Sequence, residues 1–141
     1  MILPDVNVLV YALRPETEHY AQSREWLTSV VNGPGVFGIS PQVLCSVVRL
    51  VTTRRIFPFP TLPAEAFEFC NTLLEHPQCQ TVGPGKRHWR IFEDLCRTAD
   101  AKGNLVTGAW FAALAIESGC EWITYDRDYA RFPGLRWRVP G

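Results

Sequence analysis

The chain has 141 residues and carries 14 basic and 14 acidic side chains, so its formal net charge is zero. This length suits one compact domain with a sizeable core and is short for two, so we expect a single domain over residues 1–141. A hydrophobic fraction of 47% and a charged fraction of 20% exclude a disordered or fibrous protein, and the charge balance excludes attraction to nucleic acid through the net charge of the whole protein.

The first half of the chain alternates short apolar runs with helical periodicity. The N-terminal run predicts a buried strand that ends near Asp5, followed by a helical turn or two that stops at Arg14 and Pro15. Ser40 before Pro41 is a typical helix start, because serine caps a helix and proline suits its first turn. We expect a helix over 16–32, a strand over 36–39, a helix from 41 to about 53, and a loop through the prolines at 58, 60 and 63.

The second half continues the alternation. We expect helices over 64–75, 86–101 and 105–118, strands over 79–82, 121–125 and 135–139, and a turn with helical character over 126–132. The side chains expected to face inward include Phe67, Cys70, Leu73 and Leu74 in the helix over 64–75, and Trp89 in the helix over 86–101. Thr107 is expected to cap the N-terminus of the helix that runs to residue 118. This order of elements favours an α/β sandwich with a mostly parallel sheet and right-handed crossovers.

The five cysteines are widely spaced and contain no C-x-x-C pair. They predict free, buried thiols in a reducing cytosol, and they do not have the spacing of zinc ligands. The N-terminal stretch is interrupted by Asp5 and Asn7 and has no preceding basic region, so we do not expect a signal peptide. No apolar run is long enough for a membrane span, and we expect a cytoplasmic protein.

Acidic side chains follow two of the predicted strands. Asp5 ends the first strand, and Asp126 and Asp128 follow the strand that begins at residue 121. Ligands of parallel sheets collect beyond the carboxyl ends of the strands, so these carboxylates converge if the two strands are neighbours. Clustered carboxylates are typical of a site for Mg²⁺ or Mn²⁺, and such a metal can support cleavage of a phosphodiester bond.

Each of these acids also has a purely structural interpretation. Asp5 could cap the helical turn that begins at Val6, and Asp126 and Asp128 could shape a turn and pair with Arg127 or Arg131. The spacing of the residues does not decide between the two interpretations.

Basic residues offer weaker signals. The segment from Lys86 and Arg87 to Arg90 surrounds Trp89 and could contact RNA, although Trp89 also fits the buried face of its helix. Arg49 and Arg127 are further candidates for contacts with RNA.

Three segments, MILPDVNVLVYA, SPQVLCSVVRLVTTRRIF and GNLVTGAWFAALAIESGCEWITYDRDYARFPGLRW, closely resemble the PIN-domain ribonuclease toxins of VapBC-type toxin-antitoxin modules. The similarity runs from residue 1 to the C-terminus in the same order. It implies a three-layer α/β/α sandwich, Mg²⁺- or Mn²⁺-dependent endonucleolytic cleavage of RNA such as tRNA or rRNA, inhibition by a VapB-type antitoxin, and a homodimer.

The resemblance also implies roles for single residues. Asp5, Asp126 and Asp128 match the metal-binding and catalytic acids of the family. Asn7 and Thr124 match positions that support those acids.

Two positions depart from the family pattern. Many relatives carry a glutamate where Ser46 stands, and Gly108 stands where a metal-site aspartate is expected. Ser46 can still hydrogen-bond a metal-bound water, whereas Gly108 removes a carboxylate from the start of a helix. We therefore expect weaker metal binding and poor RNA cleavage.

Gly108 has three interpretations: a natural feature of a degenerate toxin, an inactivating substitution, or a residue that admits close backbone approach. A protein that binds antitoxin and RNA without cleaving is the main alternative to an active ribonuclease. A phosphotransfer enzyme with Asp5 as nucleophile is disfavoured, because such enzymes usually have a second aspartate where this chain has Asn7.

Overall fold

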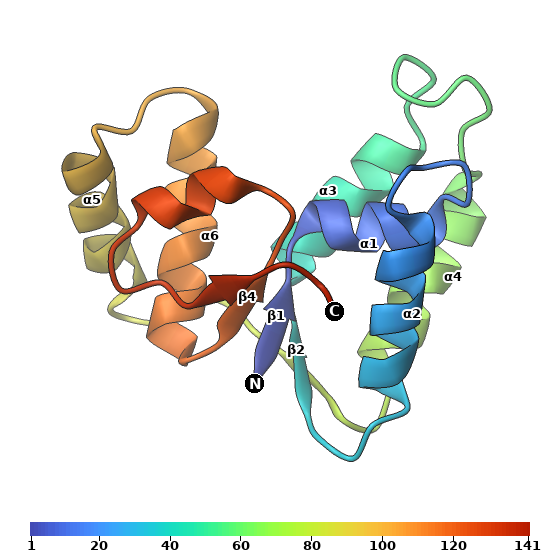
Figure 1. The fold of residues 1–141 in the computed structure, drawn as a ribbon, viewed down its shortest axis with the longest axis horizontal. Helices are drawn as coiled ribbons and strands as arrows, with labels where there is room; N and C mark the ends of the chain where they lie inside the picture. Colours follow the sequence, from blue (N-terminus) through green and yellow to red (C-terminus); the bar gives the residue numbers. More distant parts are fainter.

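The computed structural model describes all residues from Met1 to Gly141. In chain order its elements are β1 (Ile2–Pro4), α1 (Val6–Leu13), α2 (Tyr20–Val31), β2 (Phe37–Ile39), α3 (Pro41–Val51), α4 (Pro63–Leu74), β3 (Cys79–Thr81), α5 (His88–Ala99), α6 (Asn104–Ser118), β4 (Glu121–Ile123), the short 3₁₀ helix η1 (Arg127–Arg131) and β5 (Trp137–Arg138). Figure 1 shows α5 and α6 on one side of the strands and α1 to α4 on the other. The expected α/β/α layering is confirmed.

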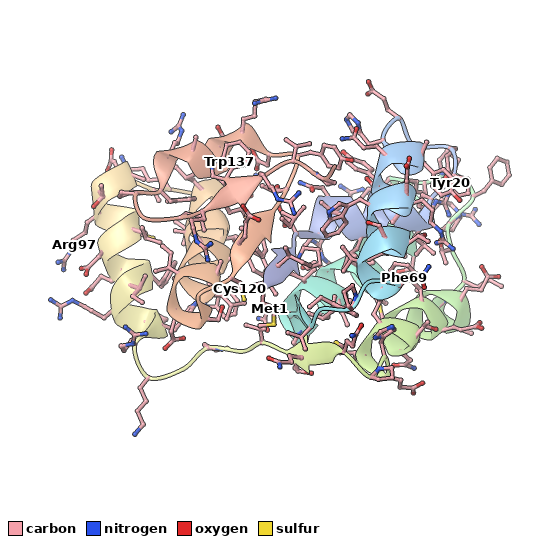
Figure 2. All side chains as sticks on the ribbon, turned by 60° about the horizontal axis from the view of Figure 1, so that its bottom comes forward. Met1, Tyr20, Phe69, Arg97, Cys120 and Trp137 are labelled. Carbon is pink, nitrogen blue, oxygen red and sulfur yellow. The ribbon has the colours of Figure 1, made fainter.

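All strand pairs are parallel, but they form two hydrogen-bonded groups. β1, β4 and β5 form one group in the order β1-β4-β5, and β2 pairs with β3. β2 lies against β1 without a ladder, and Gly38 permits this approach because a Cβ there would lie 3.2 Å from the carbonyl oxygen of Ile2. The pairing of β1 with β4 begins near Met1 and Cys120, which lie next to each other in Figure 2. There the N–H of Glu121 donates to the carbonyl of Met1 at 2.9 Å.

The helix α6 supplies six of the 29 buried residues of the hydrophobic core and packs against α5, β4 and η1. Its buried residues run from Ala109 through Leu114 and Ala115, so most of its circumference is covered, as expected of a helix that is apolar on nearly all sides. Figure 2 shows Arg97 pointing outward from α5, away from α6. α6 is therefore an interior helix, and α5 covers its outer side.

Three side chains that were predicted to face inward are exposed in the structure. Phe67 is 54% exposed and Trp89 is 68% exposed. In α4 the buried residues are Ala66, Cys70 and Leu73, so the predictions for Cys70 and Leu73 are confirmed, whereas Leu74 is 36% exposed. In α5 the buried residues are His88 and Leu95, which places the neighbouring Trp89 about 100° around the helix from His88.

The predicted cap of α6 is also wrong. The helix begins at Asn104 because Gly103, with φ of 60°, turns the chain into it, and no side chain caps its first turn. Thr107 is an exposed residue inside the helix, and Gly108 lies in its second turn. A charge at Gly108 would gain little from the helix dipole, whose effect fades within the first turn.

All five cysteines are free thiols, as predicted. Cys70 and Cys120 are buried, but Cys45 is exposed, because it lies on the face of α3 opposite Val43 and Val47. None of the helices combines the length and apolar character that a membrane crossing requires.

Candidate active site

Asp5 is a buried carboxylate at the junction of β1 and α1. Its backbone N–H donates to the carbonyl of Ile123 at 2.8 Å, which continues the β1-β4 pairing by one residue. Its Oδ1 accepts a hydrogen bond from the N–H of Val6 at 2.6 Å, so the capping role considered for Asp5 is confirmed. Its other oxygen, Oδ2, does not take part in this cap and faces a partner that follows β4. The residue is 6% exposed.

Thr124 joins Asp5 to the segment that follows β4. Its hydroxyl donates to Oδ2 of Asp5 at 2.7 Å and accepts the backbone N–H of Asp126 at 3.0 Å. Because the register places Pro4 beside Ile123, the next residues on the two strands, Asp5 and Thr124, meet directly. The fully buried Thr124 therefore fixes the position of both aspartates.

Asn7 completes this network. Its Nδ2 donates to Thr124 Oγ1 at 3.2 Å and lies 3.4 Å from Oδ2 of Asp5. Its Oδ1 accepts the backbone N–H of Tyr125 at 3.3 Å. Asn7 and Thr124 thus contact the acids that the sequence led us to expect.

The electrostatics of the site show excess negative charge. Burial raises the pKa of Asp5 from 3.8 to about 6, and hydrogen bonds from Thr124 and Val6 oppose this effect. The charge of Asp126 raises the pKa further. None of the ion pairs in the structure involves Asp5, so its carboxylate has no cationic side chain as partner.

Asp5 and Asp126 open onto one surface hollow of about 600 Å³. The polar residues around it include most of the residues expected at the site, together with others on α6: Asp5, Asn7, Ser46, Arg49, Asn104, Thr107 and Asp126. Gly108 lies in the wall of the same hollow. The sequence singled out five positions for the metal site, either as ligands or as departures from the family pattern. Four of them line this hollow, and the exception is Asp128.

Asp128 lies outside this hollow. It lines a smaller hollow of about 80 Å³ with Asp126, Asn104 and Gly108. Its backbone N–H donates to Asp126 Oδ1 at 2.9 Å, and its carboxylate lies 3.8 Å from Arg131. The turn-shaping and pairing roles considered for these acids are thus present.

No three or more acidic, histidine or cysteine side chains group closely enough to hold a metal ion. The arrangement instead offers two carboxylates, Asp5 and Asp126. This fits Mg²⁺, which usually keeps several waters and takes only one or two carboxylates from the protein.

The structure leaves room for a side chain at Gly108. A Cβ added there would lie 3.6 Å from Phe132 Cε2 and 3.8 Å from Tyr129 Cζ, which are ordinary van der Waals distances. The interpretation that Gly108 admits close backbone approach is therefore wrong. The Cβ of an aspartate would therefore be accommodated at this position, on the lining of the hollow that Asp5 and Asp126 share.

The basic candidates separate into two groups. Arg49 lines the hollow, and none of the ion pairs in the structure involves it. Lys86 and Arg87 do not line it, because the loop that carries them is hydrogen-bonded to Glu117 near the end of α6. Roughly 13 Å of helix rise separates Glu117 from Gly108. Arg127 is exposed beside Asp126 but is also absent from the lining.

Several residues that line the hollow were not predicted from the sequence. Tyr129 is 6% exposed and lines both cavities, and burial, followed by the charges of Asp5 and Asp126, raises the pKa of its hydroxyl far above the usual range. Tyr11 and Phe57 form part of an apolar end. All three lie within the segments that carry the family resemblance, but the residue pattern alone gave none of them a role in the site.

Comparison with known proteins identifies relatives along nearly the whole chain. The PIN domain family model matches residues 2–135. VapC ribonuclease Mb2897 of Mycobacterium bovis is 41% identical over 140 residues, which cover 99% of this chain and 95% of the relative. Ribonuclease VapC31 of Mycobacterium tuberculosis is 37% identical over 136 residues, which cover 96% of each chain.

Solved structures show the same fold at lower identity. VapBC2 from Rickettsia felis, bound to a DNA fragment from its promoter, superposes with a TM-score of 0.68 at 17% identity and covers 99% of this chain and 98% of its own. VapC20 of Mycobacterium tuberculosis, described as a Sarcin-Ricin loop cleaving toxin, gives a TM-score of 0.64 at 16% identity and covers 96% and 99%.

Proposed function

The chain belongs to the PIN-domain family, and on that premise we propose that it is a VapC-type toxin, a metal-dependent endoribonuclease whose activity is impaired by Gly108. The observation that carries the proposal is the pair Asp5 and Asp126 on one hollow, with Asp5 buried and without a cationic partner. A divalent cation would supply the missing positive charge.

The residues of the hollow have separable tasks in this proposal. Asp5 and Asp126 would hold Mg²⁺ or Mn²⁺, which supplies the positive charge that activates water and stabilises a phosphate under attack. Thr124 and Asn7 hold the Asp5 carboxylate in position, and Thr124 also holds the backbone N–H of Asp126, through the hydrogen bonds described above. Ser46 offers a hydroxyl to a metal-bound water from the α3 side of the hollow. The buried Tyr129 keeps its proton and remains a hydrogen-bond donor.

Gly108 is the reason to expect weak activity. With only two carboxylates on the hollow, the metal is held by fewer protein ligands, and its water is placed less accurately. A displacement of about 1 Å costs on the order of 100-fold in rate. Asp128 lies in the adjoining hollow, where it would act through a water or through Asp126 rather than replace the missing ligand.

Gly108 also favours a second candidate, a PIN-domain protein that binds antitoxin and RNA without cleaving. We propose a VapB-type antitoxin as partner in either case, because several structures with this fold are VapBC complexes. We further propose that the protein is cytoplasmic and forms homodimers, as the family resemblance implies. The two candidates differ in whether a restored carboxylate produces cleavage.

Gly108→Asp provides the test. Cleavage of bacterial tRNA and rRNA is measured with Mg²⁺ or Mn²⁺ for the unchanged chain and for the variant, and Mg²⁺ binding is measured by calorimetry. We expect the variant to bind Mg²⁺ more tightly and to cleave about 100-fold faster. Adding Asp5→Asn to Gly108→Asp should abolish the gain.

Gly35→Asp is the matched control. It also adds one carboxylate at a glycine with open space, but Gly35 lies on an exposed loop away from the hollow. It should change neither metal binding nor cleavage. If Gly108→Asp binds Mg²⁺ more tightly but does not cleave, the binding protein is the better assignment. If it neither binds metal nor cleaves, the site assignment is wrong.

A further inference from the structure

The hollow extends beyond the carboxylates to an apolar end that the proposed chemistry does not use. Its walls there come from Tyr11 on α1, Leu50 on α3, and Ile56 and Phe57 on the loop between α3 and α4. Ile56 is 49% exposed although it is a large apolar residue. Metal-dependent cleavage needs only the polar end, so the apolar end requires a separate explanation.

The loop that carries Ile56 and Phe57 is held in place by a buried arginine. Arg14 donates from Nη1 to Thr61 Oγ1 at 2.9 Å and from Nη2 to the carbonyl of Phe59 at 2.8 Å. Its guanidinium carbon lies 4.3 Å from the centre of the Phe57 ring, over one face of that ring. The N–H of Phe57 also donates to the carbonyl of Thr53 at 3.0 Å. The aromatic wall is therefore fixed before any ligand arrives, which lowers the entropic cost of binding.

The charges around this wall favour an anionic ligand. The segment from Arg49 to Pro63 contains three arginines, Arg49, Arg54 and Arg55, and no carboxylate. All three are exposed, and none of the ion pairs in the structure involves them. An aromatic platform flanked by free arginines is typical of proteins that bind single-stranded nucleic acid.

We propose that this apolar end is a subsite for an unpaired nucleobase next to the scissile phosphate. The base packs against Phe57, Ile56 and Tyr11, and the guanidinium of Arg49 contacts an adjoining phosphate. The inference rests on the proposed ribonuclease function and adds which side chains of this chain receive a base of the RNA. A base stacked inside a duplex could not reach a wall set into the hollow.

Phe57→Leu tests the subsite because it keeps an apolar side chain but removes the aromatic face. Binding is measured with a short unstructured RNA that carries 2-aminopurine, with EDTA present so that no cleavage occurs. We expect affinity to fall by about 5- to 100-fold and the fluorescence quenching of 2-aminopurine to be lost. Phe57→Trp should retain both, which separates loss of stacking from damage to the loop.

Phe59→Leu is the matched control, because Phe59 lies on the same loop, is 88% exposed and does not line the hollow. It should leave affinity and quenching unchanged. An RNA with an abasic site should bind the unchanged chain and Phe57→Leu equally.

The outcomes distinguish this inference from the proposed function. If Gly108→Asp cleaves RNA but Phe57→Leu binds as tightly as the unchanged chain, the subsite is refuted and the ribonuclease assignment stands. That result would also be expected if the apolar wall served a protein partner. If neither the unchanged chain nor Gly108→Asp binds RNA, both proposals fail.

Discussion

Replacing Asp5 by asparagine should stabilise the metal-free protein at neutral pH, although the residue lies at the centre of a hydrogen-bond network. Burial is the main cause that raises the pKa of Asp5 from 3.8 to about 6. Between these values the folded protein binds more protons than the unfolded chain, so stability falls as pH rises. The contribution of the protonated group is fully present below pH 3.8 and is lost as pH rises through about 6.

The pKa values set the size of the effect. The difference between 3.8 and about 6 corresponds to about 3 kcal/mol of unfolding free energy. Asparagine keeps an oxygen that accepts the N–H of Val6 and carries no charge. We therefore expect the unfolding free energy of Asp5→Asn to equal that of the unchanged protein at about pH 4. At about pH 7.5 it should be higher by up to about 3 kcal/mol.

Urea unfolding at several pH values, with EDTA present, measures this difference. Adding Mg²⁺ at neutral pH should stabilise the unchanged protein and leave the variant unaffected, because ligand binding to the folded state raises its stability. A free-energy difference that does not change with pH would refute the reasoning on burial. Equal stabilisation of both proteins by Mg²⁺ would show that Asp5 is not a metal ligand.

Three further perturbations test the contacts around the site. Thr124→Val should lower the unfolding free energy by about 1–3 kcal/mol in urea, because it removes the donor to the buried carboxylate of Asp5 and the acceptor of the Asp126 N–H; an unchanged value would contradict the central role of this hydroxyl. For Glu117, burial raises the pKa, but hydrogen bonds from the backbone N–H groups of Gly85 and Arg87 outweigh it and lower the pKa overall. The stabilisation by Glu117 is thus present above its usual pKa of 4.5 and is lost as pH falls. Glu117→Gln should therefore have a lower unfolding free energy in urea than the unchanged protein at neutral pH, and this difference should shrink in acid. A difference that does not change with pH would argue against this account. Arg14→Met should lower stability by about 2 kcal/mol and speed tryptic cleavage between residues 52 and 62, where its hydrogen bonds hold the loop; unchanged cleavage would show that the loop is ordered without it.

The strands and helices were predictable because local patterns determine them. Ser40 before Pro41 predicted the start of α3, and the serine hydroxyl does accept the N–H of Val43, at 3.4 Å. Predictions of which side of a helix faces inward were less successful. Phe67 and Trp89 have apolar neighbours at helical spacing, but the packed faces of α4 and α5 are rotated away from them. Propensity does not specify which neighbouring element covers a helix.

By itself, the sequence determined the α/β character, the acidic ends of two strands and the resemblance to PIN-domain toxins. It could not show that those ends meet, because spacing along the chain carries no information on which strands are neighbours. Only the tertiary structure decided that β1 pairs with β4, which brings Asp5 to Thr124 and Asp126. It also placed Asp128 outside the main hollow and Gly108 in its wall. The physical reason is that local sequence supplies the side chains, whereas long-range contacts set the strand register and helix packing that position them.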